Sequence, residues 1–150
     1  MPYLLITAGV FIFDFFIKRF VDKKYACGET YPKCRNKIII EKYYNKGAAM
    51  NFLAKKPEIM RGLHTVVLLF VGMGYYLLLR MKGKPLCKAG TSLLLGGGLS
   101  NLYDRYTKEH VVDYFHINLG PKWMRGIIFN ISDFCIFIGA LLSLAGSEQT

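Results

Sequence analysis

The segment LHTVVLLFVGMGYYLLL, residues 63–79, decides the class of protein to which this chain belongs. It holds one histidine, His64, and no Lys, Arg, Asp or Glu. A helix needs about 20 residues to cross the hydrocarbon core of a bilayer, within a range of about 17–25. The segment therefore predicts a transmembrane helix. Three further apolar segments of similar length occupy residues 3–20, 86–103 and 126–145.

The composition supports a membrane protein. Hydrophobic residues make up 53% of the 150 residues, yet the formal net charge is +10. Apolar and basic residues are therefore segregated along the chain, which is typical of membrane spans joined by basic loops. We expect no nucleic-acid partner, because the chain has no phosphate-binding or zinc motif.

The spacing of the cysteines and histidines argues against a metal site. The four cysteines form no C-x-x-C, and no His pair has the spacing of metal ligands. Cys27 and Cys34 share a polar loop, where they either form a local disulfide or remain two free thiols.

Two polar connections contain strand-like pieces. Residues 37–44 and 111–117 are rich in β-branched and aromatic residues. We therefore expect one domain over residues 1–150, mainly α, with four transmembrane helices and a small β-sheet on the membrane surface. Four spans put both termini on one side, and the raw Lys and Arg count would place the long loops in the cytoplasm. The charge count alone leaves the orientation open, because the first loop is long and folded.

Polar residues inside apolar sequence indicate a functional site. An ionisable group in the middle of a bilayer costs roughly 2.5 kcal/mol or more. In a four-span topology the ends of the first and third segments and the start of the fourth lie near the same membrane face. The residues that can meet there are Asp14, Asn101, Asp104, Arg105, Asp113, Asn130 and Asp133.

Two of these carboxylates suit hydrolysis. Asp113 lies in an apolar stretch, and Asp133 has no basic residue within helical reach on its own segment. Two carboxyl groups held close together share a proton at neutral pH. The ionised member can then activate water, and the protonated member can polarise a carbonyl group.

Structural roles compete with these functional ones. Asp14 and Lys18 can form an i, i+4 ion pair, and Asp104 can pair with Arg105. Arg105 can also form a salt bridge with Asp133. The run Gly96–Gly98 favours close helix packing.

Five motifs in register resemble one known family, the signal peptidases II, which are four-span bacterial aspartic peptidases that process lipoproteins. The matching blocks are Asp14–Lys18 (D-x-x-x-K), Asn45–Met50 (N-x-G-A-A-F in the family), Gly97–Arg105 (G-G-x-x-N-x-x-D-R), His110–Tyr114 (H-V-V-D-F) and Phe129–Asp133 (F-N-x-A-D). The resemblance covers nearly the whole chain.

The resemblance implies a role for each matching residue. Asp113 and Asp133 would form the catalytic dyad. The substrate-binding residues would be Asn45, Gly47, Asn101, Arg105 and Asn130, and the supporting residues would be Asp14, Lys18 and Asp104.

The resemblance also implies a reaction and a location. A monomer in the bacterial cytoplasmic membrane would remove the signal peptide from a diacylglyceryl-modified prolipoprotein, before the lipidated cysteine, without metal or cofactor. A β-cradle and the site would lie at the outer face, with both termini in the cytoplasm, against the raw charge count. A catalytically inactive relative that binds lipoproteins, and a proton transporter, are the alternatives.

Three residues depart from the family motifs. Met50 and Tyr114 replace Phe, and Ser132 replaces Ala. We expect these departures to affect substrate preference more than activity. The very basic first loop is also unusual. Its lysines, among them Lys23, Lys24, Lys33 and Lys37, lead to the hypothesis that it docks on anionic lipid headgroups.

Overall fold

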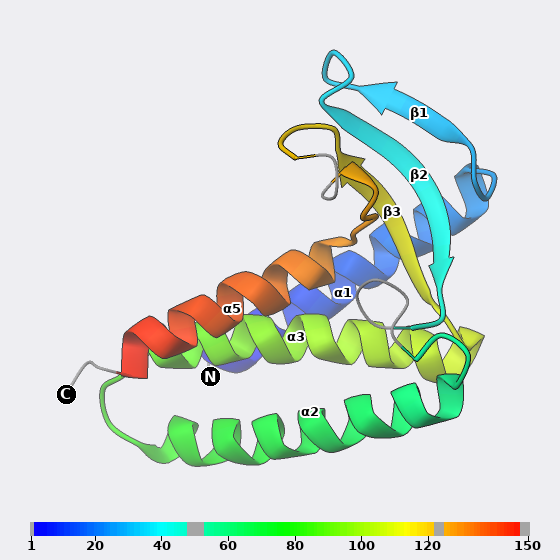
Figure 1. The fold of residues 1–150 in the computed structure, drawn as a ribbon. Coiled ribbons are helices and arrows are strands. Elements are labelled where there is room, and N and C mark those ends of the chain that lie inside the picture. Colours follow the sequence, from blue (N-terminus) through cyan, green and yellow to red (C-terminus); the bar gives the residue numbers. More distant parts are fainter. Residues whose placement is uncertain (1, 48–52, 122–124, 148–150) are drawn as a thin grey trace.

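The computed structural model describes residues 2–47, 53–121 and 125–147. Within them, four long helices lie side by side and a three-stranded sheet stands at one end (Figure 1). The helices are α1 (Pro2–Lys24), α2 (Pro57–Arg80), α3 (Pro85–Lys108) and α5 (Ile131–Ser147). The strands are β1 (Thr30–Lys33), β2 (Ile38–Asn45) and β3 (Val111–Ile117). The predicted mainly helical fold with a small sheet is confirmed.

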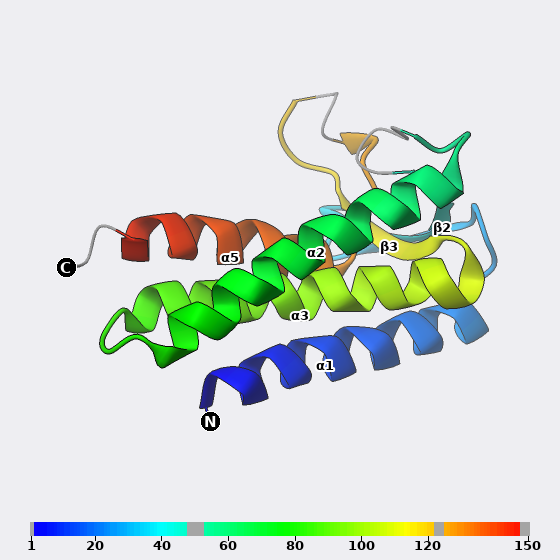
Figure 2. The same ribbon diagram turned by 90° about the horizontal axis from the view of Figure 1, so that it is seen from below.

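Helix α3 is the central element, and the run Gly96–Gly98 lets the other three helices approach it closely. Successive helical residues point about 100° apart, so three in a row face three directions. A Cβ atom added to Gly96 would lie 2.7 Å from a backbone oxygen of α1. One added to Gly97 would lie 2.6 Å from the backbone oxygen of Ser132 on α5, and one on Gly98 would meet Leu68 on α2 at 2.5 Å. The predicted close packing is therefore confirmed, with α3 contacting all three other helices (Figure 2).

The outer faces of the helices are apolar, as expected for a membrane protein. Phe16 on α1, Phe70 on α2 and Leu144 on α5 are each at least 65% exposed. Among the described residues, α2 alone is both long and apolar enough to pass a test for a membrane span. Helix α5 is apolar but has 17 residues, and α1 and α3 carry charged side chains that face the interior.

The fourth predicted segment begins later than expected. Helix α5 starts at Ile131, not at residue 126, because Phe129 forms a β-bridge with Phe115 of β3. Asn130 then caps the helix. Its Oδ1 accepts a hydrogen bond from the Asp133 amide at 3.0 Å, and Asp133 Oδ2 accepts one from the Asn130 amide at 3.0 Å. This reciprocal pair has the form of a capping box.

The sheet is antiparallel, in the order β1-β2-β3. Tyr43 of β2 lies opposite Asp113 of β3, so the register brings the end of β2 to the polar centre of the molecule. The two predicted strands are confirmed. Strand β1 was not predicted, because its four residues, TYPK, show no apolar alternation.

The possible disulfide between Cys27 and Cys34 does not form. All four cysteines are free, and these two are exposed. They flank β1, whose four residues alone span about 13 Å at about 3.3 Å per residue. Bridged cysteines have Cα atoms within about 7 Å of each other. The alternative of two free thiols is confirmed.

Candidate active site

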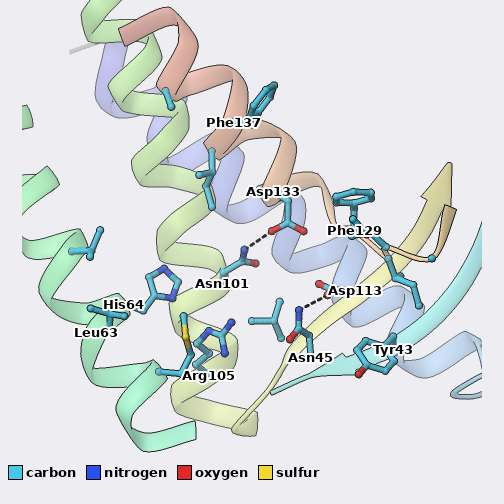
Figure 3. A pocket seen from close by; sticks show the side chains of 18 residues that line it. Tyr43, Asn45, Leu63, His64, Asn101, Arg105, Asp113, Phe129, Asp133 and Phe137 are labelled. Atoms are coloured by element: carbon cyan, nitrogen blue, oxygen red, sulfur yellow. Dashed lines mark hydrogen bonds between the residues drawn. The ribbon is translucent and has the colours of Figure 1, made fainter. Parts of the chain in front are cut away.

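A cleft of about 950 Å³ opens between α2, α5 and the sheet (Figure 3). One end is polar, and Asp113, Asp133 and Arg105 line it. The walls further along are apolar side chains of α2 and α5, including Val67 and Phe137. The complete lining is Tyr43, Asn45, Met60, Leu63, His64, Val67, Asn101, Arg105, Val111, Asp113, Gly126, Ile127, Ile128, Phe129, Asp133, Ile136, Phe137 and Ala140.

Asp113 is held by two amide side chains. It lies in strand β3, within the stretch predicted to be strand-like, and it is 2% exposed. Asn45 Nδ2 donates to its Oδ2 at 3.0 Å, and Asn130 Nδ2 donates to its Oδ1 at 2.7 Å. Burial, followed by the charge of Asp133, raises the pKa of Asp113 to about 7. The carboxyl group can therefore keep a proton near neutral pH.

Asp133 occupies the first turn of α5. Asn101 Nδ2 on α3 donates to its Oδ1 at 3.0 Å, and the Asn130 amide donates to its Oδ2. Asn130 therefore contacts both aspartates, one through its side chain and the other through its backbone. It is fully buried and does not line the cleft, so it positions the two carboxylates without facing the cleft itself.

A buried ion pair supports Asn101. Lys18 Nζ lies 2.7 Å from Asp14 Oδ2 in the predicted i, i+4 pair, and both side chains are at most 1% exposed. The same ammonium group donates to Asn101 Oδ1 at 2.6 Å. This bond fixes the orientation of the Asn101 amide, whose nitrogen then points to Asp133.

The predicted pairing of Asp104 with Arg105 is wrong. Asp104 lies 3.5 Å from Lys18 and 3.4 Å from Lys108, and it accepts a hydrogen bond from the Val112 amide at 3.2 Å. Neighbouring residues of a helix point in different directions, so Arg105 turns to the cleft instead.

Arg105 contacts the segment after β2. Its Nη2 donates to the Gly47 carbonyl at 2.5 Å, and its Nη1 donates to the Lys46 carbonyl at 3.4 Å. Gly47 in turn donates its amide to Asn45 Oδ1 at 3.0 Å. Among the described residues, no salt bridge joins Arg105 to Asp133. The rest of the predicted motif, Ala48 to Met50, lies outside the described residues.

Two of the unusual residues converge on Asp14. The Tyr114 hydroxyl donates to Asp14 Oδ1 at 3.0 Å and accepts from the Ile131 amide at 2.9 Å. The Ser132 hydroxyl donates to Asp14 Oδ2 at 2.5 Å. Each hydroxyl belongs to the chain neighbour of one aspartate of the pair, and neither lines the cleft.

The sequence analysis did not predict that α2 forms one wall of the cleft. Met60, Leu63, His64 and Val67 lie at helical spacing on one face of that helix. Their i, i+3, i+4, i+7 pattern was a readable signal, although it could not say which face turns inward. In the part of the chain that the structure describes, no group of His, Cys, Asp or Glu is suited to hold a metal ion.

Comparison with known proteins decides the family. The family model described as "Signal peptidase (SPase) II" matches residues 6–147. The chain belongs to the signal peptidase II family. The matched range contains all five motif blocks, so the resemblance read from the sequence is confirmed.

Relatives agree along nearly their whole length. A lipoprotein signal peptidase of Pseudomonas aeruginosa is 31% identical over 144 residues, covering 95% of this chain and 85% of the relative. One of Moorella thermoacetica is 28% identical, covering 95% and 89%. A solved bacterial membrane enzyme, determined by the in meso method at 2.3 Å resolution, has the same fold, with a TM-score of 0.84 and 24% identity over 97% of this chain and 87% of that one. As a signal peptidase II family member, the chain is a protease of lipoprotein processing.

Proposed function

We propose that this member of the signal peptidase II family is an aspartic endopeptidase that removes the signal peptide from diacylglyceryl-modified prolipoproteins, before the lipidated cysteine. The observation that carries the proposal is the pair of carboxylates, buried Asp113 and half-buried Asp133, that face one cleft and are both bound to Asn130. The names of the curated relatives support the substrate class.

The reaction needs one shared proton. With one carboxyl group ionised and the other protonated, the ionised member removes a proton from water as the oxygen attacks the scissile carbonyl carbon. The protonated member donates a hydrogen bond to the carbonyl oxygen, where negative charge develops. As the tetrahedral intermediate collapses, the aspartate that took the proton from water gives it to the leaving amine, the C–N bond breaks, and the dyad again holds one proton. The raised pKa of Asp113 supports a shared proton at neutral pH.

The remaining cleft residues hold the substrate. Asn45 and Asn101 orient the carboxylates, and Arg105 stands where it can contact substrate carbonyl groups. The apolar walls of α2 and α5 suit the hydrocarbon parts of a signal peptide and a diacylglyceryl group. The reaction requires no metal or organic cofactor.

We further propose that the four helices cross the bacterial cytoplasmic membrane, with the sheet and the cleft at the outer face and both termini in the cytoplasm. The apolar outer faces of the helices support this placement. We expect a monomer to suffice, because a single chain supplies both carboxylates and both walls of the cleft.

The test is cleavage of a lipidated prolipoprotein by wild type, Asp113→Asn and Asp133→Asn. General acid–base groups contribute about 10²–10⁴-fold, and we expect each variant to lose at least that much activity. Asp22→Asn is the matched control, because Asp22 pairs with Lys42 and Lys108 away from the cleft. Full activity of either dyad variant would refute the assignment, and binding without cleavage by wild type would indicate an inactive lipoprotein-binding relative.

A further inference from the structure

The turn between β1 and β2, residues 33–37, carries three cations that the proposed reaction does not use. We call this turn the basic tip. Lys33, Arg35 and Lys37 are all exposed. None of them joins a salt bridge among the residues that the structure describes. The nearest acid in the register, Glu41, lies opposite Thr30 at the other end of β1, so the positive charge of the tip is not neutralised locally.

An exposed apolar side chain stands beside the basic tip. Leu119 is 48% exposed in the loop that follows β3. Asn118 fixes this loop to the turn, because its amide donates to the Lys37 carbonyl at 2.9 Å and its Nδ2 donates to the Asn36 carbonyl at 3.0 Å. Cations next to an exposed leucine are the composition of a surface that lies at the boundary between lipid headgroups and acyl chains.

The basic tip also lies where a lipid-binding surface is expected. Figure 1 shows the β1–β2 turn and the loop after β3 to the side of the helices, level with the start of α5 rather than beyond the end of the bundle. Outside the cleft, helix α5 exposes Leu141 and Leu144, which the proposed membrane placement surrounds with lipid. Lipids that cover α5 would therefore present their headgroups at the level of the tip.

We propose that the basic tip binds the headgroups of anionic phospholipids. The proposal rests on the membrane placement proposed above. Each Lys or Arg near an anionic surface strengthens association about fivefold, so three cations together contribute about 100-fold. The attraction falls with added salt, because the cations are exposed.

Cys34 supplies the probe, since it lies in the turn as an exposed free thiol. A fluorescent maleimide is attached there after the other three cysteines are replaced by alanine. The labelled protein is reconstituted in phosphatidylcholine bilayers with or without phosphatidylglycerol, and brominated lipids report how closely the label approaches the bilayer. We expect stronger quenching with phosphatidylglycerol, and weaker quenching as salt is added.

Two triple variants test the residues. Replacing Lys33, Arg35 and Lys37 by Gln should remove the response to phosphatidylglycerol. The matched control replaces Arg80, the last residue of α2, and Lys82 and Lys84 of the loop that follows by Gln. These residues lie at the other end of the helices (Figure 1), and this variant should retain the response.

Three outcomes would overturn the proposal. They are equal quenching in both bilayers, an unchanged response in the variant of the tip, and a label that responds only to added prolipoprotein, which would assign the tip to the substrate. The readout requires no cleavage. If the protein shows the lipid response but does not cleave the substrate, the proposed function is refuted and the lipid-binding proposal stands. If it cleaves the substrate but shows no lipid response, the lipid-binding proposal is refuted and the proposed function stands.

Discussion

Removing the Tyr114 and Ser132 hydroxyls should destabilise the protein through Asp14. Tyr114→Phe and Ser132→Ala each delete one hydrogen bond to a buried carboxylate and leave the rest of the side chain in place. Hydrogen bonds to charged groups contribute about 1.5–3 kcal/mol, so each variant should lose about 2 kcal/mol of unfolding free energy. Tyr114→Phe also leaves the Ile131 amide without its acceptor, so it should be the more damaging of the two.

The double variant Tyr114→Phe/Ser132→Ala measures the coupling free energy between the two hydroxyl groups. Both hydroxyls bind the same carboxylate, and groups in one network show interaction energies of about 0.5–3 kcal/mol. We expect the two losses to be non-additive by about 1 kcal/mol, within that range. Denaturant unfolding in detergent measures all four proteins. Burial, followed by the charge of Asp14, raises the pKa of Tyr114, so its hydroxyl stays protonated over the accessible pH range.

Tyr106→Phe is the matched control, because the Tyr106 hydroxyl contacts Thr65 at an exposed site. Its effect should stay within about 0.5 kcal/mol, as is usual for surface substitutions. If Tyr114→Phe and Ser132→Ala were equally mild, the hydroxyls would not hold the two aspartate-bearing elements together. A change in substrate preference without a change in stability would support the earlier expectation from the sequence instead.

Two other substitutions test the site and the packing. Asn45→Ala should move the alkaline limb of the pH–rate profile of cleavage upward by about one unit, because a hydrogen bond of about 1.4 kcal/mol to the carboxylate form of Asp113 corresponds to that shift. The sign follows from the raised pKa of Asp113, about 7: activity falls as pH rises through that value and the shared proton is lost, and a lost donor makes the proton harder to remove. An unchanged or lower limb would contradict this account. Gly97→Val should lower the free energy of unfolding by about 1–3 kcal/mol through overpacking against Ser132, whereas Gly72→Ala, which meets no atom within 4 Å, should not, and equal stability of the two variants would contradict the close packing.

The helices and the strand bearing Asp113 could be predicted because their signals are local. A long apolar run predicts a helix and a β-branched stretch predicts a strand, without knowledge of tertiary contacts. The start of α5 could not be predicted, because Phe129 forms a β-bridge with Phe115 of β3, and an apolar run does not show that tertiary contact. Apolar residues continue through that point, and only the capping pair of Asn130 and Asp133 marks where the helix begins.

The polar members of the site could also be predicted, but their partners could not. Charged residues in apolar sequence were visible as anomalies, and the motifs gave them roles. Which charge meets which depends on helix rotation: Asp104 turned to Lys18, while its neighbour Arg105 turned to backbone carbonyl groups. The contacts of Tyr114 with Asp14 span 100 residues of sequence and follow from packing alone.

The ion pair within α1 bears on how this chain enters a bilayer. Synthesis proceeds from the N-terminus, so α1 is complete long before α3 emerges. Asp14 and Lys18 sit one turn apart on the same helix and compensate each other without any later segment. An uncompensated charge at mid-bilayer costs about 2.5–3.5 kcal/mol on insertion scales. With the membrane placement proposed above, helix α1 would insert without needing a later segment and would then be the surface on which Ser100, Asn101 and Asp104 of α3 assemble.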